Sequence, residues 1–536
     1  MFPARTTLGG RHGRRPLASA ALWARTRASG TALAGLAAVA AFVALAALAA
    51  LAAPAAHAAQ ELPPEALQAL RRAGVPSESI SVVIHDLSAG RSVFEWQEQR
   101  PVNPASLAKL LTTMAALDRL GPAWTWATPV WLNGPVRDGV LEGPLVIKGN
   151  GDPRLVLERV WLLLRRVQQL GVREIRGDIV LDNSAFSVLE SDAGEFDGEP
   201  LRPYNVRASA LMLNFRAAVY TFVPDEAAGV ARVQMEPPLA GALFDRTVPL
   251  ASGPCGDWRG ALQAGFEPGR TRFAGGYATA CGEQSWPVAD PQPASYDARL
   301  IEGLWREMGG RLQGVVREGL APTDLKPSFE QRSPALAEVV RDINKFSNNL
   351  MAQQLFYTLA LQGRRASVPP LAGAAVPAGT VSALSAATVS AVSAATVTTE
   401  QAREVLTRWV VERTGEAGGD LVLDNGSGLS RKTRISAHRL ARLLTQAYDS
   451  PVMSELMSSL PITGLDGTLR RSRATPGRAH LKTGSLRDVA AVAGYVLSNS
   501  GKRYVLVAII NHASANAARP ALDALVQWTM RDTPAR

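Results

Sequence analysis

The sequence predicts an α/β fold in which the two ends of the chain build one unit, with β-rich material inserted between them. Three observations predict it. Strands and a helix lie near the N-terminal end, further strands and a helix lie near the C-terminal end, and the long middle is rich in glycine, proline and short strands. The 536 residues are enough for two or three domains.

The N-terminal part of this unit starts with a short helix over residues 64–73, which Gly74 ends. The stretch ISVVIHDLSAGRSVFEWQ (80–97) predicts two strands around a Ser-Ala-Gly turn. An apolar-periodic helix follows, with Pro104 near its start and Gly121 at its end.

The middle of the chain, about 126–320, contains strand-like stretches such as LEGPLVIKGNG, EIRGDIVLDN and ARVQMEPP. The C-terminal part supplies three strands joined by short turns, in HLKTGSL (480–486) and VAAVAGYVLSNSGKRYVLVAIIN (489–511). A last amphipathic helix runs from about Ala515 to Met530. The chargeless run 367–399, with the near-repeat SALSAATVSAVSAATV, predicts a disordered insertion without chemistry.

Residues 1–58 predict a secretory signal peptide. Residues 1–29 carry six arginines and no acid, an apolar run follows from Gly30, and Ala56-His57-Ala58 is a small-x-small cleavage sequence. The apolar run is also long enough to span a bilayer, so the alternative is an uncleaved membrane anchor. We expect an exported, periplasmic protein cleaved near Ala58.

Charge and cysteine content argue against a nucleic-acid-binding protein and against a zinc protein. Loss of the leader's six arginines lowers the formal charge from +10 to +4, and no basic-aromatic stripe points to nucleic acid. A mild positive charge suits anionic wall polymers or peripheral contact with a membrane. In an exported chain the pair Cys255 and Cys281 is most simply a disulfide, worth about 3 kcal/mol. A zinc site has little support, and no cofactor is predicted.

The stretch PASLAKLL places Ser106 one helical turn before Lys109, in a chain with only seven lysines among 57 basic residues. Serine needs an adjacent base to act as a nucleophile, and a lysine with a lowered pKa can be that base, whereas arginine stays protonated. The alternative is that Lys109 simply reaches water from an amphipathic helix.

Two further motifs follow in order. Ser347-Asn348-Asn349 opens an apolar helix, as an N-cap or as a proton relay (Ser347) and an amide-binding group (Asn349). In the strand HLKTGSL, Lys482 adds positive charge, and the hydroxyls of Thr483 and Ser485 suit a carboxylate. A second SxN, Ser514-Ala515-Asn516, falls after KTG and breaks the order.

SxxK, SxN and KTG in this order are the signature of serine penicillin-interacting enzymes. The chain resembles the low-molecular-mass class C penicillin-binding proteins, which are D-alanyl-D-alanine carboxypeptidases and endopeptidases. The interval of 241 positions between Ser106 and Ser347 suits the extra domains of that class. Three further stretches resemble family segments: GNGDP (149–153), PYNVRASALMLN (203–214) and DNGSGLSR (424–431). Asn150 stands where the family has glycine, so a turn is the preferred interpretation of Asp152.

The resemblance implies a transpeptidase/β-lactamase-like domain, an antiparallel sheet flanked by helices, built from residues 59–125 and 321–536. It also implies two inserted β-rich domains. The outer one comprises 126–213 and 290–320, and the inner one, 214–289, carries Cys255 and Cys281.

The resemblance also implies a mechanism on peptidoglycan stem peptides. Ser106 would attack the carbonyl between two D-alanines, Lys109 would take its proton, and Ser347 would relay a proton to the leaving amine. The expected substrate-binding residues are Asn349, Lys482, Thr483 and Ser485, and the backbone N–H groups of Ser106 and Ser485 would form an oxyanion hole. β-Lactams would acylate Ser106 as inhibitors, and no metal is required.

Three alternatives remain open at this stage. A β-lactamase shares the serine chemistry, although the long interval between the first two motifs argues against it. Carboxypeptidase and endopeptidase activity are not separable from sequence. A catalytically idle peptidoglycan-binding scaffold is the third alternative, because sequence alone does not show an assembled site.

Overall fold

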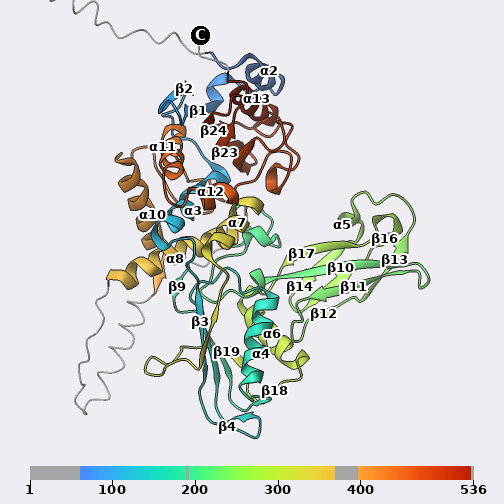
Figure 1. Cartoon of the computed structure of the whole chain (residues 1–536). Coiled ribbons are helices and arrows are strands. Elements are labelled where there is room, and N and C mark those ends of the chain that lie inside the picture. Colours follow the sequence, from blue (N-terminus) through green and yellow to red (C-terminus); the bar gives the residue numbers. More distant parts are fainter. Residues whose placement is uncertain (1–60, 189–191, 368–395, 533–536) are drawn as a thin grey trace, which may run out of the picture. The chain divides into compact units, whose positions relative to one another are not determined.

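The computed structural model describes residues 61–188, 192–367 and 396–532, which belong to one compact unit (Figure 1). Its first sheet has five strands, all paired antiparallel, from both ends of the chain. In their order across the sheet these are β2 (Arg91–Trp96), β1 (Ile80–Asp86), β24 (Arg503–Asn511), β23 (Val489–Leu497) and β22 (Ala479–Leu486). The strands predicted at both ends and their union in one antiparallel sheet are confirmed.

Helices cover both faces of this sheet, because successive strand residues point to opposite sides. Val505, Val507 and Ile509 belong to one hydrophobic cluster, and the alternating residues Leu506 and Ala508 belong to another. The second cluster also contains residues of α2 (Pro64–Arg72) and α13 (Arg519–Met530). The last helix starts four residues later than predicted, since Pro520 occupies its first turn, where proline is tolerated.

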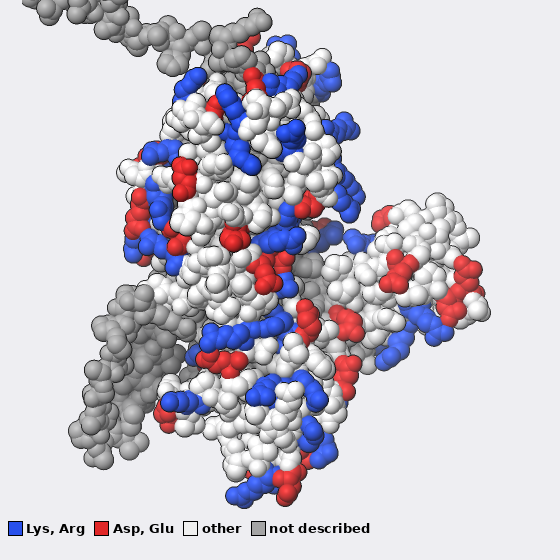
Figure 2. Space-filling view, in the orientation of Figure 1, with Lys and Arg blue, Asp and Glu red and all other residues white. Residues whose placement is uncertain are grey.

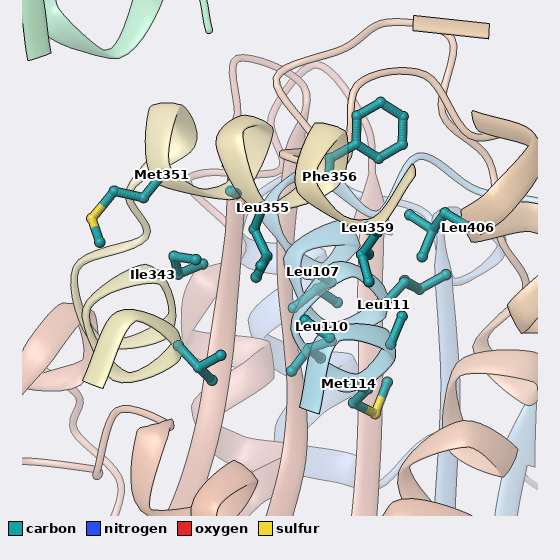
Figure 3. Packing of buried hydrophobic residues seen from close by; sticks show 14 of the residues in the cluster. Leu107, Leu110, Leu111, Met114, Ile343, Met351, Leu355, Phe356, Leu359 and Leu406 are labelled. Carbon is teal, nitrogen blue, oxygen red and sulfur yellow. The ribbon is translucent and has the colours of Figure 1, made fainter. Parts of the chain in front are cut away.

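The first cluster surrounds helix α3 (Ala108–Leu120), which is buried at every position from Ala108 to Leu117. Figure 3 shows leucines of α3 facing residues of α7 and α8, and Leu406 of α10. The other helices of this part are α7 (Leu336–Phe346), α8 (Asn349–Ser367), α10 (Thr399–Thr414), α11 (Ala437–Tyr448) and α12 (Met453–Ser459). A helix segment that is buried on all sides belongs to the core, so a polar group within Ala108–Leu117 is desolvated.

The middle of the chain forms further sheets. One has the order β19 (Val316–Glu318), β8 (Ile179–Asp182), β6 (Leu145–Lys148), β3 (Ala127–Leu132) and β20 (Phe329–Arg332). A second contains β18 (Arg311–Leu312), β7 (Glu174–Ile175), β5 (Val140–Leu141) and β4 (Val136–Arg137), and both share a hydrophobic core with α4 (Leu157–Gln169) and α6 (Pro293–Glu307). Because β20 pairs with β3, the first of these sheets extends past the boundary predicted at 321.

Residues 217–289 form a separate hydrophobic cluster under two small sheets. The first has the order β16 (Tyr277–Ala278), β13 (Thr247–Ala251), β11 (Val230–Glu236), β10 (Ala217–Asp225) and β17 (Gln284–Ala289). The second has the order β12 (Leu243–Phe244), β15 (Arg270–Phe273) and β14 (Ala264–Glu267), and a short helix α5 (Trp258–Ala261) joins the cluster. Cys255 and Cys281 form the expected disulfide.

The predicted leader and most of the predicted insertion 367–399 lie outside the described residues. The ends of that insertion are described: Ser367 is the last residue of α8, and β21 (Val397–Thr398) pairs with β9 (Phe186–Ser187). Across the described ranges, no helix has both the length and the apolar character needed to cross a bilayer. The division into domains stays a prediction.

The packing around α3 gives a stability prediction. Leu110→Ala removes a side chain that is 0% exposed and should lower the free energy of unfolding by about 2–5 kcal/mol, because the rigid surroundings leave a cavity. Urea unfolding followed by circular dichroism measures it. The control is Leu465→Ala, at a 56% exposed position, where we expect a change within about 0.5 kcal/mol. Equal midpoints for Leu110→Ala and the wild type would contradict the packing in Figure 3.

Candidate active site

Ser106 lies in a tight 3-10 turn, Ala105–Leu107, that precedes α3. The predicted helix therefore does not include the serine in its regular part. The backbone of Ala105 has a φ of +48°, a left-handed conformation that is unfavourable for a non-glycine residue. Its N–H donates to Oδ1 of Asn103 at 2.9 Å, and Nδ2 of Asn103 donates to the carbonyl of Ser430 at 2.9 Å. These bonds hold the turn that presents the Ser106 hydroxyl.

Lys109 lies on the first turn of α3 and is 0% exposed. Its Nζ atom lies 3.0 Å from Oγ of Ser106, and it donates to Oδ1 of Asn349 at 2.7 Å and to the carbonyl oxygen of Ser427 at 2.6 Å. The alternative of a lysine that reaches water is therefore wrong. Burial lowers the pKa of Lys109 well below its usual value, and the nearby charge of Lys482 lowers it further.

The hydrogen bonds of Lys109 suit the neutral amine. A neutral primary amine has two N–H donors and one lone pair, whereas the ammonium has three donors and no acceptor. Asn349 and Ser427 take the two donors. The lone pair is then left for the hydroxyl proton of Ser106, and this geometry is suited to general-base catalysis.

Lys482 forms a second buried pair with Ser347. Its Nζ is 0% exposed and donates to Oγ of Ser347 at 2.9 Å and to the carbonyl of Thr483 at 2.8 Å. Burial lowers the pKa of Lys482 to about 7. Ser347 connects α7 to α8 in a left-handed conformation, with φ +56°, so the chain reverses at this hydroxyl.

The remaining predicted residues also lie at the site, with partners that the sequence did not indicate. Oγ1 of Thr483 donates to Oγ1 of Thr468 at 2.7 Å, and Oγ of Ser485 accepts from Nη2 of Arg519 at 2.8 Å. Asn349, expected to orient substrate, holds Lys109 through its oxygen. No sequence signal pointed to Thr468 or Arg519.

Two glycines allow strand β22 and the loop 424–431 to approach the Ser106 turn. A Cβ on Gly484 would lie 2.6 Å from the carbonyl oxygen of Pro104, and a Cβ on Gly428 would lie 1.9 Å from that of Ala105. Any side chain there would push β22 or the loop away from the serine. The DNGSGLSR stretch therefore acts by close backbone contact, which also delivers the Ser427 carbonyl to Lys109.

These residues border an open cleft of about 1410 Å³. Its wall includes Ser106, Ser347, Asn349, Thr483 and Ser485, which come from segments far apart in the sequence. The lining also includes residues from other segments: Phe196, Asp197, Tyr204, Arg431, Thr468, Leu469, Arg471, Ser472, Arg473, Leu486, Arg487, Arg519, Pro520, Leu522 and Asp523. Within the described ranges no three His, Cys, Asp or Glu side chains are arranged to hold a metal ion.

Asp152 is buried outside the lining of this cleft. Its Oδ1 accepts from the N–H of Arg154 at 2.8 Å, which is the turn expected from GNGDP, while Oδ2 has no hydrogen-bond partner. Burial raises the pKa of Asp152 to about 6, against the lowering effect of the Arg154 N–H and of the charges on Arg159 and Arg154.

Known proteins resemble this chain over most of its length. Residues 67–378 and 378–532 match the model of the D-Ala-D-Ala carboxypeptidase 3 (S13) family. A D-alanyl-D-alanine carboxypeptidase of Actinomadura sp. is 27% identical, with 82% of this chain and 78% of that protein covered. The D-alanyl-D-alanine carboxypeptidase DacB of Haemophilus influenzae is 21% identical, over 81% of this chain and 85% of that protein.

Solved structures share the fold. The crystal structure of penicillin-binding protein 4 (dacB) from Haemophilus influenzae superposes with a TM-score of 0.67 at 20% identity, covering 87% of this chain and 99% of that one. A complex of the same protein with a novel β-lactam gives a TM-score of 0.62. The predicted fold class is thereby confirmed.

The amine of Lys109 is testable by substitution. Lys109→Arg places a permanently protonated group that cannot accept a proton at this position, so modification of Ser106 by a serine-directed sulfonyl fluoride at neutral pH should slow by about a hundredfold or more. Intact-protein mass spectrometry measures the rate. Lys432→Arg, the same change at an exposed position, should modify like the wild type. Equal rates for both variants would remove Lys109 as the base.

Asp152 gives a prediction on stability and pH. Its pKa of about 6 in the folded protein exceeds the unfolded value of 3.8, so ionisation costs the wild type stability as the pH rises from about 4 to about 6. Asp152→Asn avoids this cost, and its stability relative to the wild type should rise by roughly 2–3 kcal/mol across that window. Thermal unfolding at pH 4.5 and 7.5 measures it, with exposed Asp324→Asn as control. A relative stability that does not change with pH would contradict the assignment.

Proposed function

Because the chain belongs to the D-Ala-D-Ala carboxypeptidase 3 (S13) family, we propose that it hydrolyses peptidoglycan stem peptides at D-alanyl bonds through a Ser106 acyl-enzyme. The substrates are peptides ending in D-alanyl-D-alanine and D-alanyl cross-links, so carboxypeptidase and endopeptidase activity share one site. The observation that carries the proposal is the Lys109 amine, which is buried, has a pKa well below its usual value and lies 3.0 Å from the Ser106 hydroxyl.

Acylation starts with proton transfer from Ser106 to Lys109 as Oγ attacks the carbonyl carbon. The negative charge that develops on the carbonyl oxygen is stabilised by the backbone N–H groups of Ser106 and Ser485. Gly484 supports this arrangement, because it keeps the strand that carries Ser485 close to the Ser106 turn.

Ser347 passes a proton to the leaving amine as the bond to the acyl group breaks. Its hydroxyl is 2.9 Å from Nζ of Lys482, which replaces the proton that Ser347 gives up. Lys109 gains one proton in this step, and the Ser347–Lys482 pair loses one, so the proton count balances. Water then hydrolyses the ester on Ser106 and restores both groups.

The remaining predicted site residues bind the substrate. Asn349 orients the acyl part, and Thr483 and Ser485 hold the carboxylate beside the scissile bond, in the positive potential of Lys482. β-Lactams carry an amide and a carboxylate in the same relation, so they acylate Ser106 and inhibit. An argument against the scaffold alternative is that the predicted serines, Asn349 and Thr483 border one cleft. The two predicted lysines are hydrogen-bonded to Ser106 and Ser347 of that cleft.

We place the enzyme in the periplasm. The predicted leader over residues 1–58 supports export, and the Cys255–Cys281 disulfide suits an oxidising compartment. Peripheral contact with the membrane stays a prediction from the positive charge.

The test is intact-protein mass spectrometry with benzylpenicillin, together with release of D-alanine from a stem peptide. The wild type should give one stable adduct and release D-alanine, and Ser106→Ala should lose both, because no other hydroxyl can be activated by Lys109. Thr445→Ala, which removes a hydroxyl that bonds only to the carbonyl of Ala441 in its own helix α11, is the control and should keep both.

Three results would contradict the proposal. An adduct that vanishes while antibiotic is hydrolysed indicates a β-lactamase. A folded wild type without an adduct indicates the scaffold. Activity that persists in Ser106→Ala indicates another nucleophile.

A further inference from the structure

A third lysine is buried near the cleft, and the catalytic motifs do not include it. Lys345 lies in the last turn of α7, two positions before Ser347, and is 3% exposed. Figure 2 shows, by contrast, lysine and arginine side chains spread over one face of the molecule, where water solvates their charges. A buried ammonium group costs free energy unless an opposite charge compensates it, so Lys345 needs a partner at a fixed position.

The partner is Asp466, in segment 461–469, which precedes β22 in the chain. Its Oδ2 accepts from Nζ of Lys345 at 2.6 Å, and its Oδ1 accepts from the backbone N–H of Ile462 at 2.8 Å. Burial alone would raise the pKa of Asp466, but the hydrogen bonds from Lys345 and Ile462 bring it below its usual value. The carboxylate is therefore ionised and joins α7 to segment 461–469.

Segment 461–469 is also bonded to strand β22. The N–H of Thr463 donates to the carbonyl oxygen of Ala479 at 3.0 Å, and the N–H of Leu481 donates to that of Pro461 at 2.9 Å. These are bonds between backbones, so the segment keeps a fixed register along the strand that carries Lys482. The ion pair of Lys345 thus connects the end of α7 to β22.

The residues after Asp466 reach both the end of α7 and the cleft. A Cβ on Gly467 would lie 2.6 Å from the carbonyl oxygen of Lys345, so the close approach requires glycine. Oγ1 of Thr468, which lines the cleft, accepts from Oγ1 of Thr483 at 2.7 Å. Segment 461–469 therefore contacts the end of α7 and the wall of the cleft at once.

This connection bears on the contact between Ser347 and Lys482. Ser347 belongs to the corner between α7 and α8, whereas Lys482 belongs to β22, and a 2.9 Å hydrogen bond joins them. A shift of about 1 Å between the two elements would break a bond of this length, and misplacements of that size slow catalysis strongly. The Lys345–Asp466 ion pair opposes such a shift.

We propose that the Lys345–Asp466 ion pair positions the Ser347 hydroxyl against Lys482 and thereby determines how fast the leaving amine is protonated. This inference rests on the proposed function. Neither residue lines the cleft, so the pair acts through Ser347 and not on the substrate. An amine leaves only when it is protonated, whereas a thiolate leaves without a proton. The pair therefore matters for amide substrates and little for thioesters.

The test compares two substrates that differ at the leaving atom. One is an N-acylated peptide ending in D-alanyl-D-alanine, and the other is the thioester in which sulfur replaces the leaving nitrogen. Asp466→Asn should lower kcat/KM for the amide by about tenfold and leave the thioester within about twofold, because Ser106 and Lys109 keep their contacts. Lys345→Met, a second variant that removes the buried charge itself, should show the same selective loss.

Two further variants complete the design. Asp466→Glu keeps the charge and should restore part of the amide activity. Asp342→Asn is the matched control, because it removes a carboxylate of α7 that pairs with Arg154, and its ratio of amide to thioester activity should equal that of the wild type.

Two results would overturn the positioning role. Equal losses on amide and thioester in Asp466→Asn and Lys345→Met would indicate a general structural role of the pair. Unchanged amide activity in both variants would show that Ser347 does not depend on it. A wild type that cleaves neither substrate would instead contradict the proposed function.

Discussion

Water is kept away from the amine of Lys109 by a helix that is buried on every side, and the chemistry of the cleft follows from that exclusion. In water the amine would be charged and useless as a base. Burial of α3 lowers the pKa of this amine well below its usual value, and two acceptors, on Asn349 and Ser427, fix the orientation of the amine. The leucines of α3 that pack on α7 and α8 are thus as necessary to the reaction as the serine (Figure 3).

The partners of Lys109 come from distant parts of the chain. Asn349 and Ser427 lie 240 and 318 positions away in sequence. The entropy of closing such long loops grows only slowly with their length, so large insertions between the motifs are tolerated when their ends lie close together. The sheets formed by residues 127–332 are such an insertion, between Ser106 and Ser347. The inserted segment also adds Asp197 and Tyr204 to the lining of the cleft.

The sequence predicted the elements with strong local patterns and missed those that depend on distant contacts. The strands around Val83 and Val507 are short, nearly continuous apolar runs, so they were predictable. Ser106, Lys109, Ser347 and Lys482 were predictable from their ordered motifs. The short exposed strand Phe329–Arg332 exists because β3 pairs with it, and its own pattern is weak. The left-handed Ala105, the Ser427 carbonyl and the Arg519 contact to Ser485 have no local signature, because each is set by the approach of another segment.

Because β24 lies between β1 and β23, the central sheet cannot form until β24 has been synthesised. A chain synthesised from its N-terminus produces Ser106 and Lys109 early, yet β1 has no inner neighbour until residues 503–511 emerge. Until then the hairpin of β1 and β2 exposes an unpaired edge, and β22, which carries Lys482, has no sheet to join. The peptidase therefore stays inactive until β24 has been made and has paired with β1.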